Sequence, residues 1–306
     1  MTFILAVAVD LTADLDPAQG GPARLRAVRA LEAAGADFVT LGEGPGAADS
    51  TLGALDVLAK IAPITANIGL VPTVTVARRE PVLVSTATAT LDYASRGRSG
   101  WQAAVDGGDP AGEWERAEAL IDVVRELWDA WEDRAVRDEV AERYIDRDRL
   151  RYENFLPAEG ARGAGAMPRP PQGNPPVVIG VSDTASLDTA ARTADVVVLA
   201  DGAGLTTTDV RSRIVAHGRG ALPVRILLSV PYPYPGGDAL IARVHTELRD
   251  GPLDGLHLRP LSLAGDARGI AHDLIPRLRA EGILGAAGLG SLRRRLGLGA
   301  ALRPSA

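Results

Sequence analysis

The sequence contains no cysteine, so disulfide bonds, thiolate metal sites and cysteine nucleophiles are all excluded. A basic surplus is missing too, because 39 acidic residues outnumber 33 lysines and arginines and the formal net charge is −6. Nucleic acids and anionic membranes are therefore not expected partners. Long apolar runs are also lacking, and the short run at 3–9 has no basic residue before it. We therefore expect a cytoplasmic protein that does not cross a membrane.

The motifs of the commonest cofactor-binding and hydrolytic enzymes are absent as well. The chain has no G-x-G-x-x-G after an apolar strand, no G-x-x-x-x-G-K-[ST], no H-E-x-x-H and no G-x-S-x-G. Its histidines are scattered at His217, His245, His257 and His272, and no two of them have the i, i+4 spacing of metal ligands on a helix. We expect structural or solvated histidines and no metal site.

Short apolar segments alternate with amphipathic helical patterns along most of the chain. The predicted strands span 3–9, 37–41, 67–76, 98–104, 177–180, 195–199, 224–230 and 253–258. The clearest helix follows Asp109 and Pro110, an N-cap residue and an N1 proline. Continuous apolar strands, each paired with a helix, favour a parallel TIM (β/α)8 barrel, with a doubly wound open sheet as the alternative.

Two stretches interrupt this pattern. Residues 133–176 are first highly charged and then rich in glycine and proline, which predicts a surface insertion after the fourth helix rather than core elements. Residues 285–306 follow a helix predicted over 268–281, and they contain Leu292-Arg-Arg-Arg-Leu296. We predict a short, solvated helix there.

In a (β/α)8 barrel, functional groups gather at the C-terminal ends of the strands. Ser182 precedes a predicted helix, so it is either part of a phosphate site with the first helical amides or an ordinary helix cap. The neighbouring Asp183 would repel a phosphate. Glu43 is either a hydrogen-bonding partner for a heteroaromatic ring or a solvated loop carboxylate, and Trp114 faces either the core or the site.

Several blocks of sequence resemble one enzyme family, and they occur in the same order along nearly the whole chain. The blocks are Asn67-Ile-Gly-Leu-Val-Pro-Thr73, Glu80-Pro81, Leu91-Asp92, Gly97-Arg-Ser-Gly-Trp101, Glu115-Arg-Ala-Glu118, Val123-Val-Arg-Glu-Leu-Trp-Asp-Ala-Trp-Glu132 and Leu292-Arg-Arg-Arg-Leu-Gly-Leu298. They are similar to the luciferase-like flavin-dependent monooxygenases, most of all to the branch that holds nitrilotriacetate monooxygenase, dibenzothiophene-sulfone monooxygenase and pristinamycin synthase.

The resemblance implies a single barrel domain of the bacterial luciferase type over 1–306, with an insertion at 133–176. It also implies a two-component monooxygenase in which a separate NAD(P)H:flavin reductase supplies reduced FMN. Dioxygen and a small organic molecule would be the other substrates. By analogy with the family we expect a homodimer, to which the apolar face of the helix at 113–131 would contribute.

The flavin-binding residues implied by the resemblance match the family only in part. Thr73 is retained at the end of the third strand, whereas Glu43 replaces an aspartate and Gln102 replaces an asparagine. Trp114 replaces a tyrosine that contacts phosphate, so a hydroxyl donor is lost. We expect these residues to line the cofactor site, and no residue is assigned a catalytic role.

The phosphate block departs furthest from the family pattern. Ser182 is retained, but Val181 stands in place of a glycine and Asp183 in place of a serine. Lost donors and an added negative charge would weaken FMN binding. Two alternatives to an FMN enzyme therefore stay open. One is a flavin-poor relative that acts as a partner subunit or binding protein, and the other is a hydride-transfer enzyme that uses a deazaflavin.

Overall fold

The computed structural model describes residues 3–10, 17–42, 53–76, 79–106, 109–132, 136–138, 143–145, 147–150, 153–156, 161–163, 165–234 and 238–301. Its centre is a closed barrel of parallel strands in the order β1-β12-β11-β10-β9-β4-β3-β2. These strands are β1 Ile4–Ala8, β2 Phe38–Leu41, β3 Gly69–Thr75, β4 Trp101–Ala104, β9 Val177–Val181, β10 Val196–Ala200, β11 Arg225–Tyr232 and β12 Gly255–Pro260.

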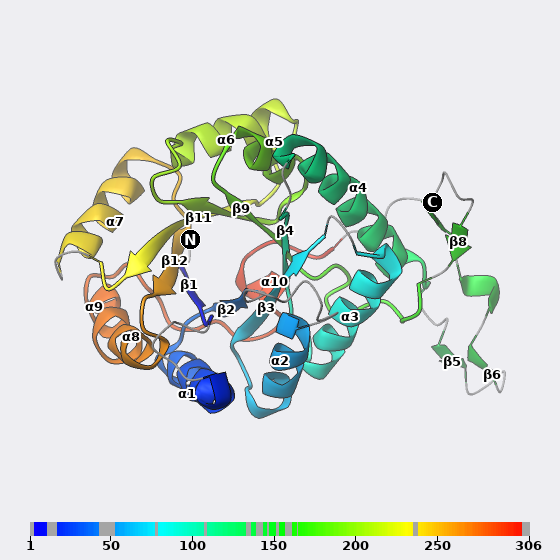
Figure 1. Cartoon of the computed structure of the whole chain (residues 1–306), viewed down its shortest axis with the longest axis horizontal. Coiled ribbons are helices and arrows are strands. Elements are labelled where there is room, and N and C mark those ends of the chain that lie inside the picture. Colours follow the sequence, from blue (N-terminus) through cyan, green and yellow to red (C-terminus); the bar gives the residue numbers. More distant parts are fainter. Residues whose placement is uncertain are drawn as a thin grey trace.

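Helices surround this barrel as an outer ring (Figure 1). They are α1 Pro17–Ala34, α2 Gly53–Ile61, α3 Pro81–Ala94, α4 Pro110–Asp129, α5 Thr184–Thr193, α6 Thr207–Ala216, α7 Ala239–Asp250, α8 Leu263–Gly269 and α9 Ile275–Ala280. Short 3₁₀ turns lie at Ala62–Ile64 and Arg147–Arg149, and a π-helical turn at Ile270–Leu274 joins α8 to α9. Among the described residues, none of these helices is both long enough and apolar enough to cross a membrane.

The barrel predicted from the alternating pattern is confirmed. β1 pairs in parallel with β2 on one side and with β12 on the other, so the sheet has no free edge. The open doubly wound alternative is wrong for this reason. Strands buried on both faces need continuous apolar sequence, because one face fills the barrel interior and the other packs against the helices.

Local signals set the start of α4 as the sequence predicted. The Asp109 carboxylate accepts a hydrogen bond of 3.3 Å from the backbone N–H of Gly112, and Pro110 occupies the first turn. The apolar face of this helix, which includes Ile121, Val124 and Trp128, is buried within the chain itself. The homodimer expected from the sequence stays a prediction.

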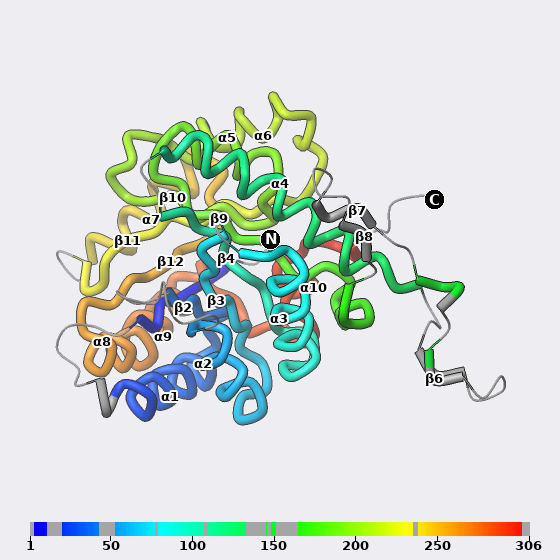
Figure 2. Tube along the Cα trace, turned by 45° about the vertical axis from the view of Figure 1, so that its right-hand side comes forward, coloured from blue at the N-terminus to red at the C-terminus, as the bar shows by residue number. Residues whose placement is uncertain are grey.

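The insertion after α4 contains no barrel strand in its described parts. It forms two short antiparallel pairs, β5 Val136–Asp138 with β6 Arg143–Ile145, and β7 Glu153–Leu156 with β8 Ala161–Gly163. β5, β6 and β8 lie outside the ring of helices (Figures 1 and 2). A surface location was predicted for this segment, whereas its assignment as an insertion within one domain over 1–306 stays a prediction.

Two expectations about the C-terminal part are wrong. The last helical segment begins with α8 at Leu263 rather than at 268. The segment 292–298 is not solvated, because Leu292 is 0% exposed and Leu296 and Leu298 are buried with it. These leucines pack against the inward-facing side chains of the strands and close the barrel at the N-terminal ends of the strands, which we call the barrel bottom. Leu292 and Leu296 have the i, i+4 spacing of neighbours on one helix side, and Leu298 follows the turn after α10 Leu292–Arg295.

Close packing at the barrel bottom explains a glycine in β3. A Cβ at Gly69 would lie 2.7 Å from Leu292 Cδ1 and 2.7 Å from Phe38 Cβ. Only a residue without a side chain lets α10 approach this closely.

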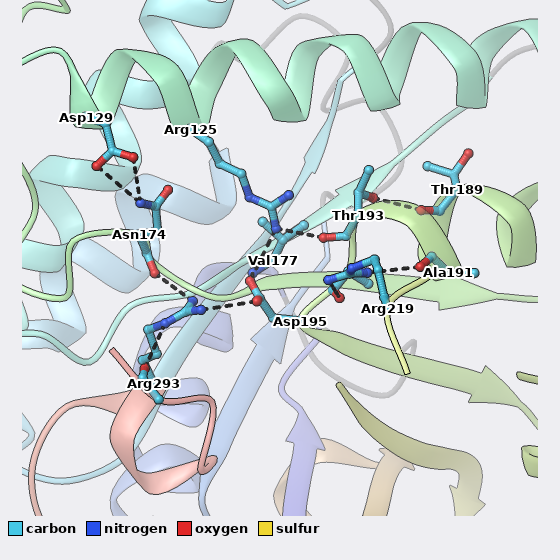
Figure 3. A network of polar contacts seen from close by, with 12 residues as sticks. Arg125, Asp129, Asn174, Val177, Thr189, Ala191, Thr193, Asp195, Arg219 and Arg293 are labelled. Carbon is cyan, nitrogen blue, oxygen red and sulfur yellow. Dashed lines mark hydrogen bonds and ion pairs between the residues drawn. The ribbon is translucent and has the colours of Figure 1, made fainter. Parts of the chain in front are cut away.

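A polar network fastens the same end of the barrel (Figure 3). Asp195 accepts hydrogen bonds from the backbone N–H of Val177 at 3.0 Å and from the guanidinium groups of Arg125 and Arg293, each at 3.4 Å. Arg293 also donates to the carbonyl oxygen of Asn174 at 3.1 Å. One carboxylate thus joins α4, β9, β10 and α10. The charge of Arg293 is therefore used inside the fold rather than in solvent.

Candidate active site at the open end of the barrel

The barrel interior changes character along its axis. Near the bottom, the inward-facing side chains are large and apolar, as in Ile4, Phe38 and Leu227. Toward the C-terminal ends of the strands, the inward-facing positions hold short side chains, among them Ala8, Ala104 and Ala200. A TIM barrel is normally filled by bulky branched residues throughout. Ala104 and Ala200 are only half-buried, so solvent reaches the upper half, which we call the barrel mouth.

Two residues predicted from the sequence lie together at this mouth. Thr73 of β3 and Gln102 of β4 are register partners on neighbouring strands, and both are half-buried. Gly180 of β9 lies beside them, because a Cβ at that position would be 3.4 Å from Gln102 Nε2. The hydroxyl and the amide therefore point into a space that the glycine helps to keep open.

A histidine that the sequence analysis expected to be structural or solvated lies at the floor of the mouth. His257 Nε2 is 2.9 Å from Thr40 Oγ1, and His257 Nδ1 is 2.9 Å from Ser229 Oγ. These three side chains come from β12, β2 and β11, and all three are buried. The signal in the sequence was a polar residue inside each of three apolar strands, but their pairing spans up to 217 residues and no local pattern reveals it.

Electrostatics keep this imidazole uncharged. Burial lowers the pKa of His257 from its ordinary value of 6.5 to about 4, and the positive charge of Arg259 contributes in the same direction. Arg259 lies two residues further along β12, so it is on the same face of the strand, and it is exposed. The floor therefore carries a neutral donor and acceptor, with a cation above it.

The N-terminus of α5 is capped by a carboxylate side chain. Asp183, rather than Ser182, is the N-cap: Asp183 Oδ1 accepts hydrogen bonds from the N–H of Ser186 at 2.8 Å and from its hydroxyl at 2.9 Å. The Ser182 hydroxyl is exposed and donates to Asp183 Oδ2 at 3.4 Å. Desolvation raises the pKa of Asp183, but the hydrogen bonds it accepts together outweigh that effect and lower its pKa, so it is ionised at neutral pH.

The remaining candidates lie in different places. Val181 is 1% exposed and packs between the barrel and the helices, so its side chain points away from the mouth. Trp114 is buried in the first turn of α4, and with Ala185 of α5 it lines a groove of about 590 Å³ between the two helices. Trp114 thus lies near the α5 N-terminus but not in the mouth. Glu43 lies outside the described residues.

Metal ligands do not converge in the described part of the chain. No three histidine or acidic side chains among those residues are placed to hold a metal ion together. The residues described above supply hydroxyl, amide and imidazole groups to the mouth. Such groups can both donate hydrogen bonds to the edge of a polar ring and accept them from it.

The closed parallel barrel is the fold that the family resemblance implied, and the family comparison agrees. Residues 1–235 match the family described as luciferase-like monooxygenase. The chain belongs to this family, as the sequence blocks predicted.

Individual relatives are similar over part of their length. The chain is 36% identical over 193 residues to nitrilotriacetate monooxygenase component A of Aminobacter aminovorans, covering 56% of this chain and 42% of that protein. It is 38% identical over 183 residues to one subunit of the pristinamycin IIA synthase of Streptomyces pristinaespiralis, covering 56% of this chain and 64% of that protein. The matched part of the chain thus spans about half the length of these curated relatives.

The fold is similar to solved structures over almost the whole chain. The crystal structure of a riboflavin lyase with modified FMN and riboflavin has a TM-score of 0.82 at 18% identity, and the match covers 98% of this chain and 97% of that one. At this level of identity the likeness concerns the fold alone.

Proposed function

We propose that this protein is the oxygenase component of a two-component monooxygenase, which uses reduced FMN and dioxygen to oxidise a small organic molecule. The observation that carries the proposal is the barrel mouth. Short side chains leave space there, and Thr73, Gln102 and the Thr40–His257–Ser229 group line it with hydrogen-bonding atoms. Membership of the luciferase-like monooxygenase family supports flavin as the ring that fills this space.

The donor set fits the ring of a flavin. A flavin edge alternates carbonyl oxygens with ring nitrogens, so it needs donors and acceptors side by side, and the Gln102 amide and two hydroxyls supply both. Gly180 keeps the amide accessible, since any side chain there would approach Gln102 Nε2. Thr73 and Gln102 would hold the ring above the Thr40–His257–Ser229 group, and Ser182 would reach toward the phosphate.

The chain's own residues would bind and orient the flavin ring and shield it from water. Bulky residues and α10 close the barrel bottom, so water can reach the ring only from the mouth. When bound, reduced flavin supplies the electrons that activate dioxygen. His257 is neutral at working pH and offers one N–H and one lone pair, so it can hold a proton at either ring nitrogen without adding charge.

The partner and the location follow from this chemistry as further proposals. An enzyme that consumes reduced flavin needs a supplier, and a separate NAD(P)H:flavin reductase in the cytoplasm would meet that need. The substrate would enter through the same mouth.

A second candidate function is a flavin-poor partner subunit, and the α5 N-terminus favours it. The Asp183 carboxylate already accepts the hydrogen bonds that this helix terminus would otherwise offer to a phosphate. The similarity to a relative that is itself named as one of the subunits of a synthase is consistent with a subunit role. The phosphate end of the site therefore fits FMN less well than the ring end does.

Calorimetric or fluorescence titration separates the two candidates. The purified protein is titrated with oxidised FMN, with anaerobically reduced FMN and with a deazaflavin cofactor. Binding of reduced FMN at micromolar concentrations supports the monooxygenase component and justifies a substrate screen with a flavin reductase. Absence of FMN binding up to millimolar concentrations contradicts it and favours the partner subunit, whereas selective binding of the deazaflavin contradicts both.

A further inference from the structure

The Thr40–His257–Ser229 group is unusual because it is polar and lies inside a barrel. Thr40 is 3% exposed, Ser229 is 4% exposed and His257 is 6% exposed. Burying three polar side chains costs desolvation energy, which aliphatic residues at the same places would avoid. Stability alone therefore does not account for this group.

The protons of the group outnumber its internal hydrogen bonds, so one donor is left over. Two hydroxyls and a neutral imidazole carry one polar hydrogen each, but they share only two hydrogen bonds. One hydroxyl donates to the unprotonated ring nitrogen. The other hydroxyl accepts from the ring N–H, so its own O–H remains available.

The imidazole tautomer decides which hydroxyl carries the spare O–H. If the proton is on Nε2, Thr40 accepts it and has the spare donor; if it is on Nδ1, Ser229 has the spare donor. In either case the charge of the group stays zero, since burial keeps the imidazole neutral. The two charged or titratable positions that matter here are Arg259, above the ring, and His257 itself.

Neither hydroxyl has a second partner within the part of the chain that the structure describes. A buried O–H without an acceptor is costly, so an acceptor from outside the chain is expected. The register neighbours of Thr40 and Ser229 on the adjoining strands include Ala8 and Ala200, which have short side chains, and Ala200 is only half-buried. Both hydroxyls face the barrel interior, at the floor of the mouth.

We infer that the spare O–H of this group donates a hydrogen bond to an acceptor atom at the edge of the flavin ring, and that His257 positions it by choice of tautomer. The inference rests on the proposed function. It makes one hydroxyl a direct ligand of the ring and His257 a positioning residue. The flavin atom that accepts this hydrogen bond is a carbonyl oxygen or an unprotonated nitrogen of the flavin ring.

The experiment combines a tautomer measurement with isosteric variants of the holoprotein. Long-range ¹H–¹⁵N NMR of the FMN-loaded protein assigns the protonated nitrogen of His257, with His257→Gln used to identify its signals. FMN dissociation constants are measured for Thr40→Val and Ser229→Ala. Thr88→Val and Ser85→Ala are matched controls, because they remove buried, hydrogen-bonded hydroxyls from α3 outside the barrel.

The tautomer predicts which variant is affected. With the proton on Nε2, Thr40→Val should weaken FMN binding by about tenfold, while Ser229→Ala and the controls change it by less than about twofold. With the proton on Nδ1, the two results exchange. Thr40→Ser retains the hydroxyl and should bind FMN as the unchanged protein does, which separates loss of the O–H from a packing defect.

Two results would overturn the inference and leave the proposed function intact. In the first, both variants bind FMN as tightly as the unchanged protein, which means that water satisfies the spare donor. In the second, FMN binding is weakened by removal of the hydroxyl that donates to the unprotonated imidazole nitrogen of His257. If the unchanged protein binds no FMN in either redox state, the proposed function fails and the inference fails with it.

Discussion

The two ends of the barrel are formed by the same strands but are packed in different ways. At the bottom, large side chains and the leucines of 292–298 fill the interior, and the Asp195 network fastens the surrounding elements. At the mouth, the inward positions carry short side chains, and hydroxyl, amide and imidazole groups face a space. The comparison teaches that stability is concentrated at one end, so that the other can tolerate incomplete packing.

Hydrogen bonding shows the same contrast. The buried carboxylate of Asp92, near the bottom, accepts bonds from Ser99 and Gln172 through both backbone and side-chain donors. Burial raises the pKa of Asp92, and these four donors oppose that rise. At the mouth, by contrast, the Thr40–His257–Ser229 group retains a donor without a partner among the described residues. The contrast holds for these two groups and not for each whole end, because Asn174 Oδ1 and Arg295 Nη2, also near the bottom, are buried without a partner among the described residues.

The largest effect is expected from breaking the closure at the bottom. Leu292→Ala removes a fully buried side chain that fills the barrel, so it should lower the free energy of unfolding by about 3 kcal/mol. Urea denaturation measures the change. Leu289→Ala is the control, because Leu289 is 77% exposed and should cost less than about 0.5 kcal/mol. Equal losses of unfolding free energy in the two variants would contradict the role of Leu292 in closing the barrel bottom.

A smaller loss is expected when the polar network loses its charge. Asp195→Asn keeps the shape of the side chain but removes the charge that faces Arg125 and Arg293, and it should cost about 2 kcal/mol by thermal or urea unfolding. Asp188→Asn breaks a pair with Arg213 that is more than one third exposed, and it should cost about 0.5 kcal/mol or less. An unchanged free energy of unfolding for Asp195→Asn would show that the network does not stabilise the fold.

The pH dependence of the free energy of unfolding tests whether His257, at the mouth, is held neutral in the folded chain. The pKa of His257 is about 4 in the folded chain and 6.5 when exposed, so between these values only the unfolded chain takes up the proton. Acid therefore favours unfolding, and the stabilising effect of a neutral His257 is lost as pH falls from about 6.5 toward 4. Between pH 7 and 5.5, the unchanged protein should lose about 1 kcal/mol more than His257→Gln.

Denaturant unfolding at both pH values provides the measurement for this prediction. The comparison with His257→Gln is needed because other buried acids, such as Asp92 and Asp37, have raised pKa values and respond to pH in the opposite direction. Parallel pH profiles for the two proteins would show that His257 is not held neutral.

The smallest change concerns the phosphate end of the site. Asp183→Ser removes a negative charge but keeps a side chain that caps α5, so stability should change by less than about 0.5 kcal/mol. FMN binding should tighten by about threefold, as titration of the folded variant would show. Asp188→Asn, on the same helix, removes a charge elsewhere and should leave the dissociation constant unchanged. Unaltered binding in Asp183→Ser would contradict a phosphate site beside α5.

The architecture could be predicted from the sequence because its signals are local. Each barrel strand is an apolar run bounded by glycine, proline or polar residues, and the Asp109-Pro110 pair marks the start of α4 within the residues that form it. The start of α8 was missed because the segment after Pro260 carries a serine and a leucine that read equally well as loop.

The bottom and the floor of the mouth could not be predicted, because their partners are far apart in the sequence. The run of arginines at 293–295 looks solvated until Arg293 is seen to reach Asp195 and Asn174. Ser182 was proposed from its place before a predicted helix, and Thr73 and Gln102 through the family resemblance, whereas the role of His257 depends on contacts with two other strands. The orientation of Val181 also required the register of β9, since alternate residues of a strand face opposite sides.

The plug at the barrel bottom has a consequence for synthesis of the chain. The segment that fills the inner core is translated after all of the barrel strands, so the emerging strands cannot complete their interior until 292–298 leaves the ribosome. Until then the apolar inner face of the sheet has no cover at one end. We therefore expect a chain that stalls before residue 292 to be prone to aggregation.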